Sequence, residues 1–397
     1  MKLFWPENMA FESAMAQLAL YKPNQPFDQE VMAFTQALSK RFLRIRELPE
    51  IVALGYWLRQ ANIKEMQAVF KQGTAQKKIR PRGTVFHIAP SNVDTIFVYS
   101  WMLSLLAGNR NIIRISSKEQ NGLNMLLQII IEELAHPAFQ KIAQQTIICT
   151  YGHEENITAV LSAACHTRVI WGGDATISAI REIPLAPLAN ELAFPDRFSL
   201  AVLNSNRLSK LDEVELDRLT EQFYNDVFWF DQMACSSPRL IIWCGDNEQA
   251  ITKFWTMFAQ KIQQKHYALM AATQVLKYTT SLVLATDNYV DNLENQPFFS
   301  RVKLSDVPAD VRERHCGGGL FYEYTVDTIE NLADVLIDKD QTISYFGFER
   351  KELENLVDAI ATRGIDRIVP IGKALEFTGI WDGQSFLTSF TREVMII

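Results

Sequence analysis

The stretch DQMACSSPR, residues 231–239, places a cysteine in a short polar segment instead of an apolar run. The thiolate is the reactive form of cysteine, and a helix N-terminus or a nearby positive charge lowers the pKa of the thiol. Ser236, Ser237 and Pro238 follow Cys235 and favour a tight turn whose backbone N–H groups can face a substrate oxygen. Two interpretations stay open here: Cys235 is a nucleophile, or it is a structural thiol in a Ser-rich turn.

A second candidate, Asn92, lies in HIAPSNVDT, residues 87–95, just before a predicted helix. Ligands of parallel α/β sheets bind beyond the carboxyl ends of the strands. A side-chain amide there can donate a hydrogen bond to the oxyanion of an acyl-transfer reaction. Asparagine is also a common helix N-cap residue, so Asn92 is either an oxyanion donor or a cap.

The other four cysteines are weaker candidates. Cys149 and Cys244 lie in apolar runs that favour packing, and Cys165 closes a predicted helix. Cys316 precedes three glycines in a predicted loop and is the rival nucleophile. Five cysteines without a CxxC pair indicate neither a disulfide framework nor a metal site. His87, on a predicted strand, is expected to make a core hydrogen bond more readily than to act in catalysis.

The elements that must position these residues alternate between apolar strands and helices. Fully apolar strands in such an alternation predict parallel sheets covered on both faces. The region from about 265 to 320 is more irregular, and a further α/β unit is expected from 320. The predicted strands are 84–90, 111–116, 145–152, 167–173, 197–206 and 239–245. The predicted helices are 28–46, 49–72, 93–107, 118–135, 154–164, 174–183, 211–230 and 247–264.

Composition sets the protein class. A chain of 397 residues with 48% hydrophobic and 21% charged residues suits two globular domains. The net charge of −7 gives no electrostatic footprint for nucleic acid. No segment reaches the roughly 18 apolar residues of a membrane span, and the N-terminus lacks the apolar run of a signal peptide. A cytoplasmic location is therefore expected.

Several long stretches resemble the LuxC family of acyl-CoA reductases, which feed fatty aldehyde to bacterial luciferase and have non-luminous relatives. The resemblance implies the α/β fold of the aldehyde dehydrogenase superfamily, with a Rossmann-like cofactor domain and an α/β catalytic domain. The implied domains are an NADPH-binding domain with N-terminal helices, a catalytic domain and a bridging or oligomerisation segment, at 1–203, 204–375 and 376–397. The stretches that carry the resemblance are 49–59, 82–118, 168–187, 223–241 and 363–383.

The resemblance also implies roles for the candidate residues of the acyl chemistry. Cys235 matches the nucleophile of the superfamily, and its backbone N–H forms half of the oxyanion hole. Asn92, in PSN, matches the asparagine that supplies the other half.

A further set of residues matches the cofactor site of the superfamily. Gly172 and Gly173 match the turn that approaches the cofactor pyrophosphate, where a backbone without Cβ can come close. Arg114 falls where the superfamily has a lysine near the adenosine ribose, and Ser116 follows at the strand end. A basic residue there suits the 2′-phosphate of NADPH over NADH. Without the resemblance, Arg114 is equally a surface charge after a buried strand.

One departure from the superfamily favours reduction over hydrolysis. Hydrolytic aldehyde dehydrogenases carry a water-activating Glu followed by Leu-Gly-Gly-Lys. When Arg197 is set against that Lys, the Glu position falls on Ala193. Glu191 lies two residues earlier and could still enter the site. A reductase that releases an aldehyde from a thioester needs no base for water.

The predicted function is NADPH-dependent reduction of an acyl-CoA, or of an acyl group on a carrier protein, to an aldehyde through an acyl-cysteine. The alternatives are a non-redox acyltransferase or thioesterase on the same scaffold, and a non-catalytic subunit that only binds ligands. The implied partners are the acyl-CoA or acyl-protein substrate, a second copy of the chain in a homo-oligomer, and an acyl-transferring protein.

Overall fold

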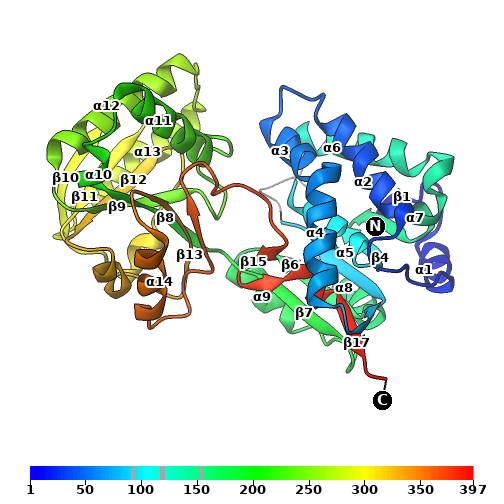
Figure 1. Cartoon of the computed structure of the whole chain (residues 1–397). Coiled ribbons are helices and arrows are strands. Elements are labelled where there is room, and N and C mark those ends of the chain that lie inside the picture. Colours follow the sequence, from blue (N-terminus) through cyan, green and yellow to red (C-terminus); the bar gives the residue numbers. More distant parts are fainter. Residues whose placement is uncertain (91–94, 117–120, 153–154, 397) are drawn as a thin grey trace. The chain divides into compact units, whose positions relative to one another are not determined.

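The computed structural model describes residues 1–90, 95–116, 121–152 and 155–396. The chain forms two compact units, Met1–Asp196 with Phe377–Ile397, and Arg197–Glu376 (Figure 1). The second unit begins at Arg197 because the next residues form a strand of its sheet. The boundary predicted after residue 203 therefore falls at the end of that strand.

The first unit is built on a six-stranded sheet in which only the first strand is antiparallel to its neighbour. From its middle strand the chain adds two strands on one side and then returns to add two on the other. In spatial order the strands are β1 (Lys2–Trp5), β5 (Thr146–Thr150), β4 (Arg110–Arg114), β3 (Thr84–Ile88), β6 (Thr167–Trp171) and β7 (Asn190–Phe194).

The strand order of this sheet reverses between β3 and β6. In open α/β sheets, ligands bind in the crevice beyond the carboxyl ends of the strands at such a reversal. The segments that leave β3, β4 and β6 at their carboxyl ends are therefore the ones to inspect for a cofactor.

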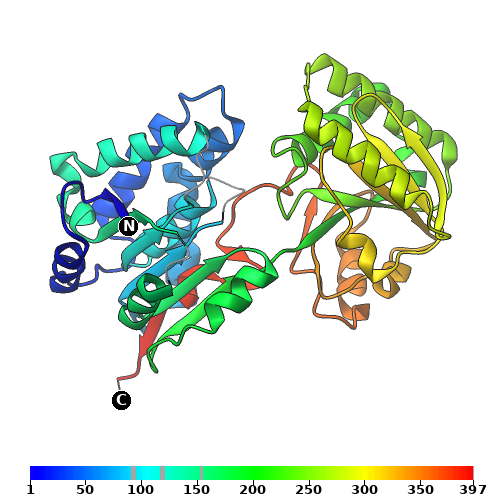
Figure 2. The same ribbon diagram turned by 180° about the vertical axis from the view of Figure 1, so that it is seen from behind.

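Helices cover both faces of the first sheet (Figure 2). Alternate strand residues enter two separate cores, so that Val85 packs on one face and Phe86 on the other. The face of Val85 is covered by α2 (Gln29–Phe42), α3 (Pro49–Trp57), α4 (Gln60–Gly73), α5 (Ile96–Leu106), α6 (Asn121–Leu134), η1 (Pro137–Phe139) and α7 (Gln140–Gln144). The face of Phe86 is covered by α1 (Phe11–Leu20), α8 (Glu155–Ala164) and α9 (Asp174–Arg181).

The C-terminal residues complete the core of the first unit, and the bridging or oligomerisation role that the resemblance implies for 376–397 stays a prediction. Buried Phe386 stacks on Trp171, and Phe390 packs edge-on against His87. The last strand also pairs with a strand before β3. These elements are β15 (Ile380–Trp381), β16 (Gln384–Ser385), α15 (Phe386–Ser389), and β17 (Thr391–Val394) paired with β2 (Lys78–Pro81).

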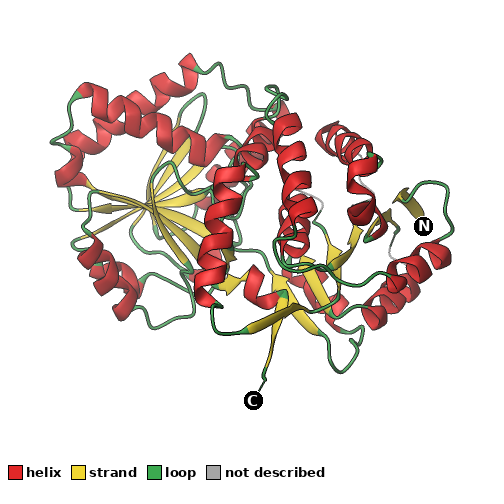
Figure 3. Ribbon diagram, turned by 45° about the vertical axis from the view of Figure 1, so that its right-hand side comes forward, coloured by secondary structure: helices red, strands yellow, loops and turns green. Residues whose placement is uncertain are grey.

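The second unit is built on a sheet flanked by helices (Figure 3). Of the seven strands of this sheet, only the edge strand β10 is antiparallel to its neighbour. Its amino edge is formed by the residues that precede each parallel strand. In spatial order the strands are β10 (Val290–Asn295), β11 (Ser300–Leu304), β12 (Leu320–Val326), β9 (Pro238–Cys244), β8 (Phe198–Asn204), β13 (Asp340–Phe346) and β14 (Arg367–Pro370).

Two cores again flank the sheet of the second unit. One face is rich in aromatic rings and is covered by α10 (Ser205–Leu208), α11 (Glu213–Phe228) and α12 (Glu248–Gln264). The other face is covered by α13 (Ala271–Leu284), η2 (Ala309–Arg312), η3 (Glu330–Asp334) and α14 (Arg350–Ala359). The predicted parallel sheets covered on both faces are thus confirmed.

The structure departs from the predicted elements in several places, two of which concern the helix predicted over 49–72 and the region predicted to be irregular. The helix predicted over 49–72 is two helices, because Arg59 adopts an extended conformation and the Asn62 amide donates to the carbonyls of Tyr56 and Trp57. The region predicted to be irregular contains α13 and the β10–β11 hairpin. Among the helices of the described ranges, none has the length and apolarity that crossing a bilayer requires.

Candidate active site

Cys235 lies in the turn that joins α11 to β9, at the amino edge of the second sheet. After α11 the chain reverses through Asp231 and Gln232, whose φ angles of 50° and 61° are left-handed. The Gln232 N–H closes the reversal by donating to the Val227 carbonyl at 2.7 Å. Cys235 itself is half-buried.

The Gln232 side chain clamps this turn to two strands. Its amide nitrogen donates to the carbonyls of Pro238 and Leu320 at 2.9 and 3.0 Å, and its amide oxygen accepts from Gly319 N–H at 2.9 Å. The side chain is fully buried, and three hydrogen bonds to backbone offset the cost of burying an amide. Sequence reasoning missed Gln232, because its partners at 319 and 320 are remote in sequence.

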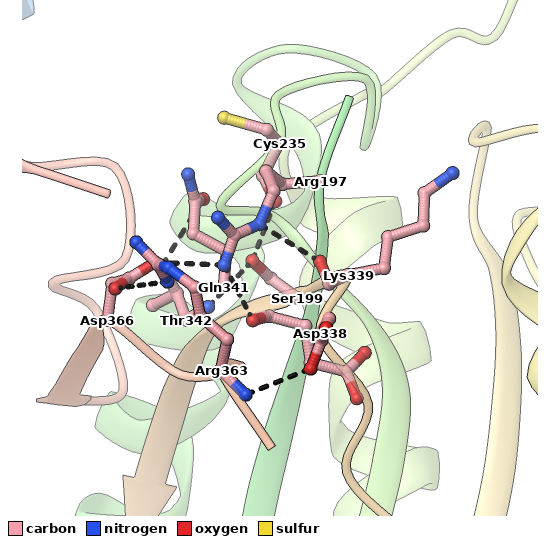
Figure 4. Close-up of polar contacts among 10 residues, drawn as sticks. Arg197, Ser199, Cys235, Asp338, Lys339, Gln341, Thr342, Arg363 and Asp366 are labelled. Atoms are coloured by element: carbon pink, nitrogen blue, oxygen red, sulfur yellow. Dashed lines mark hydrogen bonds and ion pairs between the residues drawn. The ribbon is translucent and has the colours of Figure 1, made fainter. Parts of the chain in front are cut away.

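Ser199 holds the cysteine from the sheet side (Figure 4). Its hydroxyl donates to the carbonyl oxygen of Cys235 at 2.6 Å and accepts from the N–H of Thr342 at 3.2 Å. Ser199 is fully buried on β8, and Thr342 is on β13. The Cys235 sulfur points away from this polar network in Figure 4. The backbone of the cysteine is thus tied to the sheet while its thiol faces the other way.

Arg197 anchors the same edge of the sheet. Its guanidinium donates to the carbonyls of Lys339 and Asp340 at 3.2 and 2.9 Å and pairs with the Asp366 carboxylate at 2.9 Å. Arg363 reaches the same carboxylate (Figure 4). Arg197 is the residue set against the superfamily lysine, and here it joins the loops before β13 and β14 to the start of β8.

Arg239 brings a further positive charge to the backbone of the turn. Its guanidinium donates to the carbonyls of Gln232 and Met233 at 3.4 Å each, and it lies over the ring of Phe198. The charge of Arg239 also opposes the rise in the pKa of the Cys316 thiol that burial causes. Arg239 thus ties the backbone of the turn that carries Cys235 to the start of β9.

Cys316, the rival nucleophile, lies in the loop before β12. Burial raises the pKa of its thiol, although the ammonium of buried Lys277 opposes the shift. Its neighbour His315 accepts from Gly317 N–H at 3.0 Å and bonds the Leu320 carbonyl at 2.7 Å. Burial lowers the pKa of His315 well below its usual value, so both ring nitrogens of a neutral imidazole serve the loop.

The three remaining cysteines are packing residues. Burial raises the pKa of Cys149 to about 12 and the pKa values of Cys165 and Cys244 to about 11. Thiols held protonated in this way are poor nucleophiles at neutral pH.

Gly172 and Gly173 lie in the first unit, directly after β6, at the reversal of strand order. Gly173 is the N-cap of α9, and no side chain caps this helix end. A Cβ on Gly173 would meet nothing within 4 Å, whereas one on Gly172 would press on Thr176 at 3.2 Å. The first N–H groups of a helix lack partners within the helix, so this end offers open space and backbone donors to an anion.

Arg114 ends β4 at the same edge of the first sheet, and Ser116 follows two residues later, half-buried. The Arg114 guanidinium donates to the carbonyls of Tyr151 and Gly152 at 3.2 and 3.5 Å and lies over the Tyr151 ring. The structure thus gathers the predicted cofactor residues beyond the carboxyl ends of β4 and β6. This edge, with a basic side chain and an uncapped helix end, fits a dinucleotide.

Asn92, the predicted oxyanion donor, lies outside the described residues. Neighbouring His87 is fully buried on β3, with ring nitrogens 2.8 Å from the Ser100 hydroxyl and 3.0 Å from the Asn111 amide oxygen. Burial lowers the pKa of His87 to about 4. This is the core hydrogen bonding that the sequence favours for His87.

Glu191 is on β7 of the first unit and is held in an ion-pair cluster. One carboxylate oxygen accepts from Arg168 at 2.6 and 2.9 Å, and the other accepts from Arg181 at 2.8 Å. Both oxygens are engaged by guanidinium groups, so Glu191 is not poised as a base for water. Ala193 lies two residues further along the same strand.

The chain is similar to a known protein family and to two curated proteins of that kind. The profile of the family described as acyl-CoA reductase (LuxC) matches residues 15–282. The chain is 27% identical to the long-chain acyl-protein thioester reductase of Aliivibrio fischeri and 22% identical to that of Vibrio harveyi, in each case over 76% of this chain. It spans only 60% and 61% of the length of these two relatives.

Solved structures show the fold. Aldehyde dehydrogenase 21 from Physcomitrella patens matches with a TM-score of 0.65 at 10% identity, over 98% of this chain and 86% of that one. A 1-pyrroline-5-carboxylate dehydrogenase from Thermus with bound NAD matches with a TM-score of 0.68 at 14% identity, over 96% and 84%. The predicted aldehyde dehydrogenase-like α/β fold is confirmed.

Proposed function

The chain belongs to the LuxC family of acyl-CoA reductases, and from this premise we propose that it reduces an acyl thioester to an aldehyde through a covalent acyl-cysteine at Cys235, with NADPH as reductant. The observation that carries the proposal is the half-buried Cys235 in a turn whose backbone is fixed by Ser199 and Gln232. The family match includes this turn. Each of the other cysteines has a thiol pKa raised by burial.

The first step is acyl transfer to the protein. The Cys235 thiolate attacks the thioester carbonyl carbon, a new carbon–sulfur bond forms, and the bond to the departing thiol breaks. The amide of Asn92 and the N–H of Cys235 hold the oxyanion that develops. The leaving thiolate takes up a proton as free thiol, and the acyl group stays on Cys235.

The second step releases the aldehyde. Reduced nicotinamide, when bound, supplies hydride. Gly172, Gly173, Ser116 and Arg114 are the residues that would hold this cofactor, and Arg114 supplies the positive charge that favours an adenosine 2′-phosphate over a hydroxyl. Once the acyl carbon is reduced, its bond to the Cys235 sulfur breaks, the carbonyl of the aldehyde forms, and the cysteine returns as thiolate.

The acyl donor is an acyl group on CoA or on a protein. The matched relatives are named acyl-protein thioester reductases, which supports a protein-bound acyl group beside acyl-CoA. A thioesterase has less support, because Glu191, the base that the sequence leaves open for activating water, is engaged by Arg168 and Arg181 through both carboxylate oxygens. The homo-oligomer, the acyl-transferring partner and the cytoplasmic location stay predictions.

The experiment is to trap the acyl-cysteine without reductant. The protein is mixed with acyl-CoA or acyl-carrier protein, digested and analysed by mass spectrometry. The expected result is an acyl adduct on the peptide with Cys235, which disappears with release of aldehyde when NADPH is added. An adduct confined to Cys316, or no adduct with any acyl donor from short to long chain, would overturn the proposal. Discharge as free acid instead of aldehyde would indicate a thioesterase.

A further inference from the structure

Ser199 stands out among the buried polar groups of the second unit because it connects three elements with one hydroxyl. It is fully buried on β8, donates to the Cys235 carbonyl at 2.6 Å and accepts from Thr342 N–H on β13 at 3.2 Å. A hydroxyl has one proton to donate and lone pairs to accept. With Thr342 N–H directed at the oxygen, the hydroxyl proton is given to Cys235.

The hydrogen bond from Ser199 fixes the carbonyl oxygen of Cys235. The Cys235 carbonyl is held against β8, and the side chain leaves the network on the opposite side (Figure 4). The turn as a whole is held independently, by the three hydrogen bonds of the Gln232 amide. Loss of the Ser199 hydroxyl therefore removes this hydrogen bond to the cysteine carbonyl and leaves the hydrogen bonds of Gln232 to the turn in place.

We infer that Ser199 is a positioning residue for Cys235, fixing the direction of the thiol for attack on the acyl carbonyl. The inference rests on the proposed function of Cys235 as the nucleophile. Misplacement of a reacting group by about 1 Å can cost on the order of 10²-fold in rate. Ser199 touches neither the thiol nor the reacting carbon, and it acts through the backbone of Cys235.

The chain offers a matched control at the opposite end of β8 and β9. Ser205 is also fully buried, donates its hydroxyl to the carbonyl of Cys244 at 3.1 Å and accepts from Asn247 N–H at 3.2 Å. Removing either hydroxyl deletes the same kind of bridge from the same sheet. Only Ser199 serves the cysteine in the α11–β9 turn.

The test compares Ser199→Ala with Ser205→Ala in the full chain. Both variants are expected to lower the thermal midpoint by a similar amount. Ser199→Ala is expected to lower kcat by roughly 10- to 100-fold, to leave KM for the acyl donor within about twofold, and to change the rate of Cys235 alkylation by iodoacetamide across the pH profile. Ser205→Ala should leave kcat and Cys235 alkylation close to wild type.

Two further variants guard against simple misfolding. Ser199→Thr keeps the hydroxyl and is expected to recover most of the alkylation profile. Ser199→Gly leaves room for a water and is expected to fall between wild type and Ser199→Ala. Equal alkylation profiles and equal kcat in Ser199→Ala and Ser205→Ala would overturn the inference. A changed profile in Ser199→Ala, with no acyl adduct on wild-type Cys235, would instead overturn the proposed function, and Ser199 would then set only the direction and reactivity of the Cys235 thiol.

Discussion

The two sheets of the molecule carry their candidate chemistry at opposite ends of their strands. In the first unit, Gly172 follows β6 and Arg114 ends β4, so the candidate cofactor residues lie at the carboxyl edge. In the second unit, Cys235 precedes β9, and Arg197 and Lys339 precede β8 and β13, so the proposed nucleophile lies at the amino edge. Two largely parallel sheets of similar construction thus carry their candidate sites at opposite edges.

The difference shows what each task requires. At the carboxyl edge of the first sheet, the candidate anion site is backbone: an uncapped helix end with open space at Gly173. At the amino edge of the second sheet, a buried side-chain network does the positioning, with Ser199 and Gln232 bonded to the turn and Arg197 to the adjoining strands. Cofactor binding and thiol chemistry should therefore respond to separate sets of substitutions.

The largest effect is expected from Cys235→Ala. Reduction of acyl thioesters should fall by about 10⁴-fold or more, as when a covalent nucleophile is removed, because no acyl-enzyme can form. The rise in melting temperature on adding NADPH should persist, since the candidate cofactor residues are in the other unit. The measurement is the loss of NADPH absorbance on addition of the acyl thioester, with Cys316→Ala as the control that retains turnover. Near-wild-type turnover of Cys235→Ala would refute the separation and the mechanism together.

Asn92 tests whether the first unit also contributes to the acyl chemistry. Asn92→Ala is expected to lower kcat by roughly 10²–10³-fold, the usual loss for one oxyanion donor. Asn92→Asp is the matched variant, because aspartate caps a helix as well as asparagine does but cannot donate to an oxyanion when ionised. Equal losses in both variants indicate an oxyanion donor. Activity retained by Asn92→Asp, or a loss below about threefold in Asn92→Ala, would return Asn92 to a capping role.

The sequence predicts those features of the two units that depend on neighbouring residues. Apolar runs such as TVFHI and RLIIWC predict buried strands, and the polar residues around Cys235 predict a turn. The hydrogen bond from Ser199 to Cys235 joins residues 36 positions apart, and Arg197 pairs with Asp366 across 169. Such partners are brought together by strand order, which no local pattern records.

Two elements show the same limit for the fold. The segment AATQVLKYTTSLVL forms α13 although Val275, Leu276, Leu282 and Val283 are exposed, so it lacks the polar outer face by which a surface helix is recognised. The C-terminal residues return to the first unit because Phe386 and Phe390 fill its core. The core into which they pack is formed by residues up to Asp196, nearly 200 positions earlier in the chain. A local sequence pattern therefore cannot predict where they pack.

The two units are also expected to differ in the sign of their pH dependence. His87 has a folded pKa of about 4, below its usual value of 6.5, through burial. The stability that neutral His87 contributes is therefore fully present above pH 6.5 and is lost as the pH falls toward 4, by up to about 3 kcal/mol in the free energy of unfolding.

Asp226, in the second unit, has the opposite shift. Burial raises the pKa of its carboxyl to about 7, although the hydrogen bonds that the carboxylate accepts from the N–H groups of Gly372 and Ala374 oppose this rise. Its contribution is therefore present below about pH 4 and lost as pH rises toward 7.

Hydrogen exchange, corrected for the intrinsic pH dependence of amides, measures the two units separately. Protection of β3 and β4 should rise between pH 4 and 6.5 in wild type and rise less in His87→Gln. Protection of β8 and β9 should fall between pH 4 and 7 relative to Asp226→Asn, which cannot ionise. Identical pH slopes in wild type and variant would show that the group concerned does not control the stability of its unit.

The smallest expected effect is on cofactor preference and comes from substitution of Arg114. It is the most specific test of the candidate cofactor site at the carboxyl edge of the first sheet. Arg114→Gln is expected to raise KM for NADPH by roughly tenfold, the value of one charge-assisted hydrogen bond, with little change in KM for NADH. Arg110→Gln is the control, because Arg110 begins the same strand and donates to the carbonyls of Leu18 and Ala19 at its opposite end. Alkylation of Cys235 should be unchanged in both. If Arg110→Gln shifts the NADPH preference as much as Arg114→Gln, or neither shifts it, then Arg114 is a structural cation that holds Tyr151, and the 2′-phosphate must be recognised elsewhere.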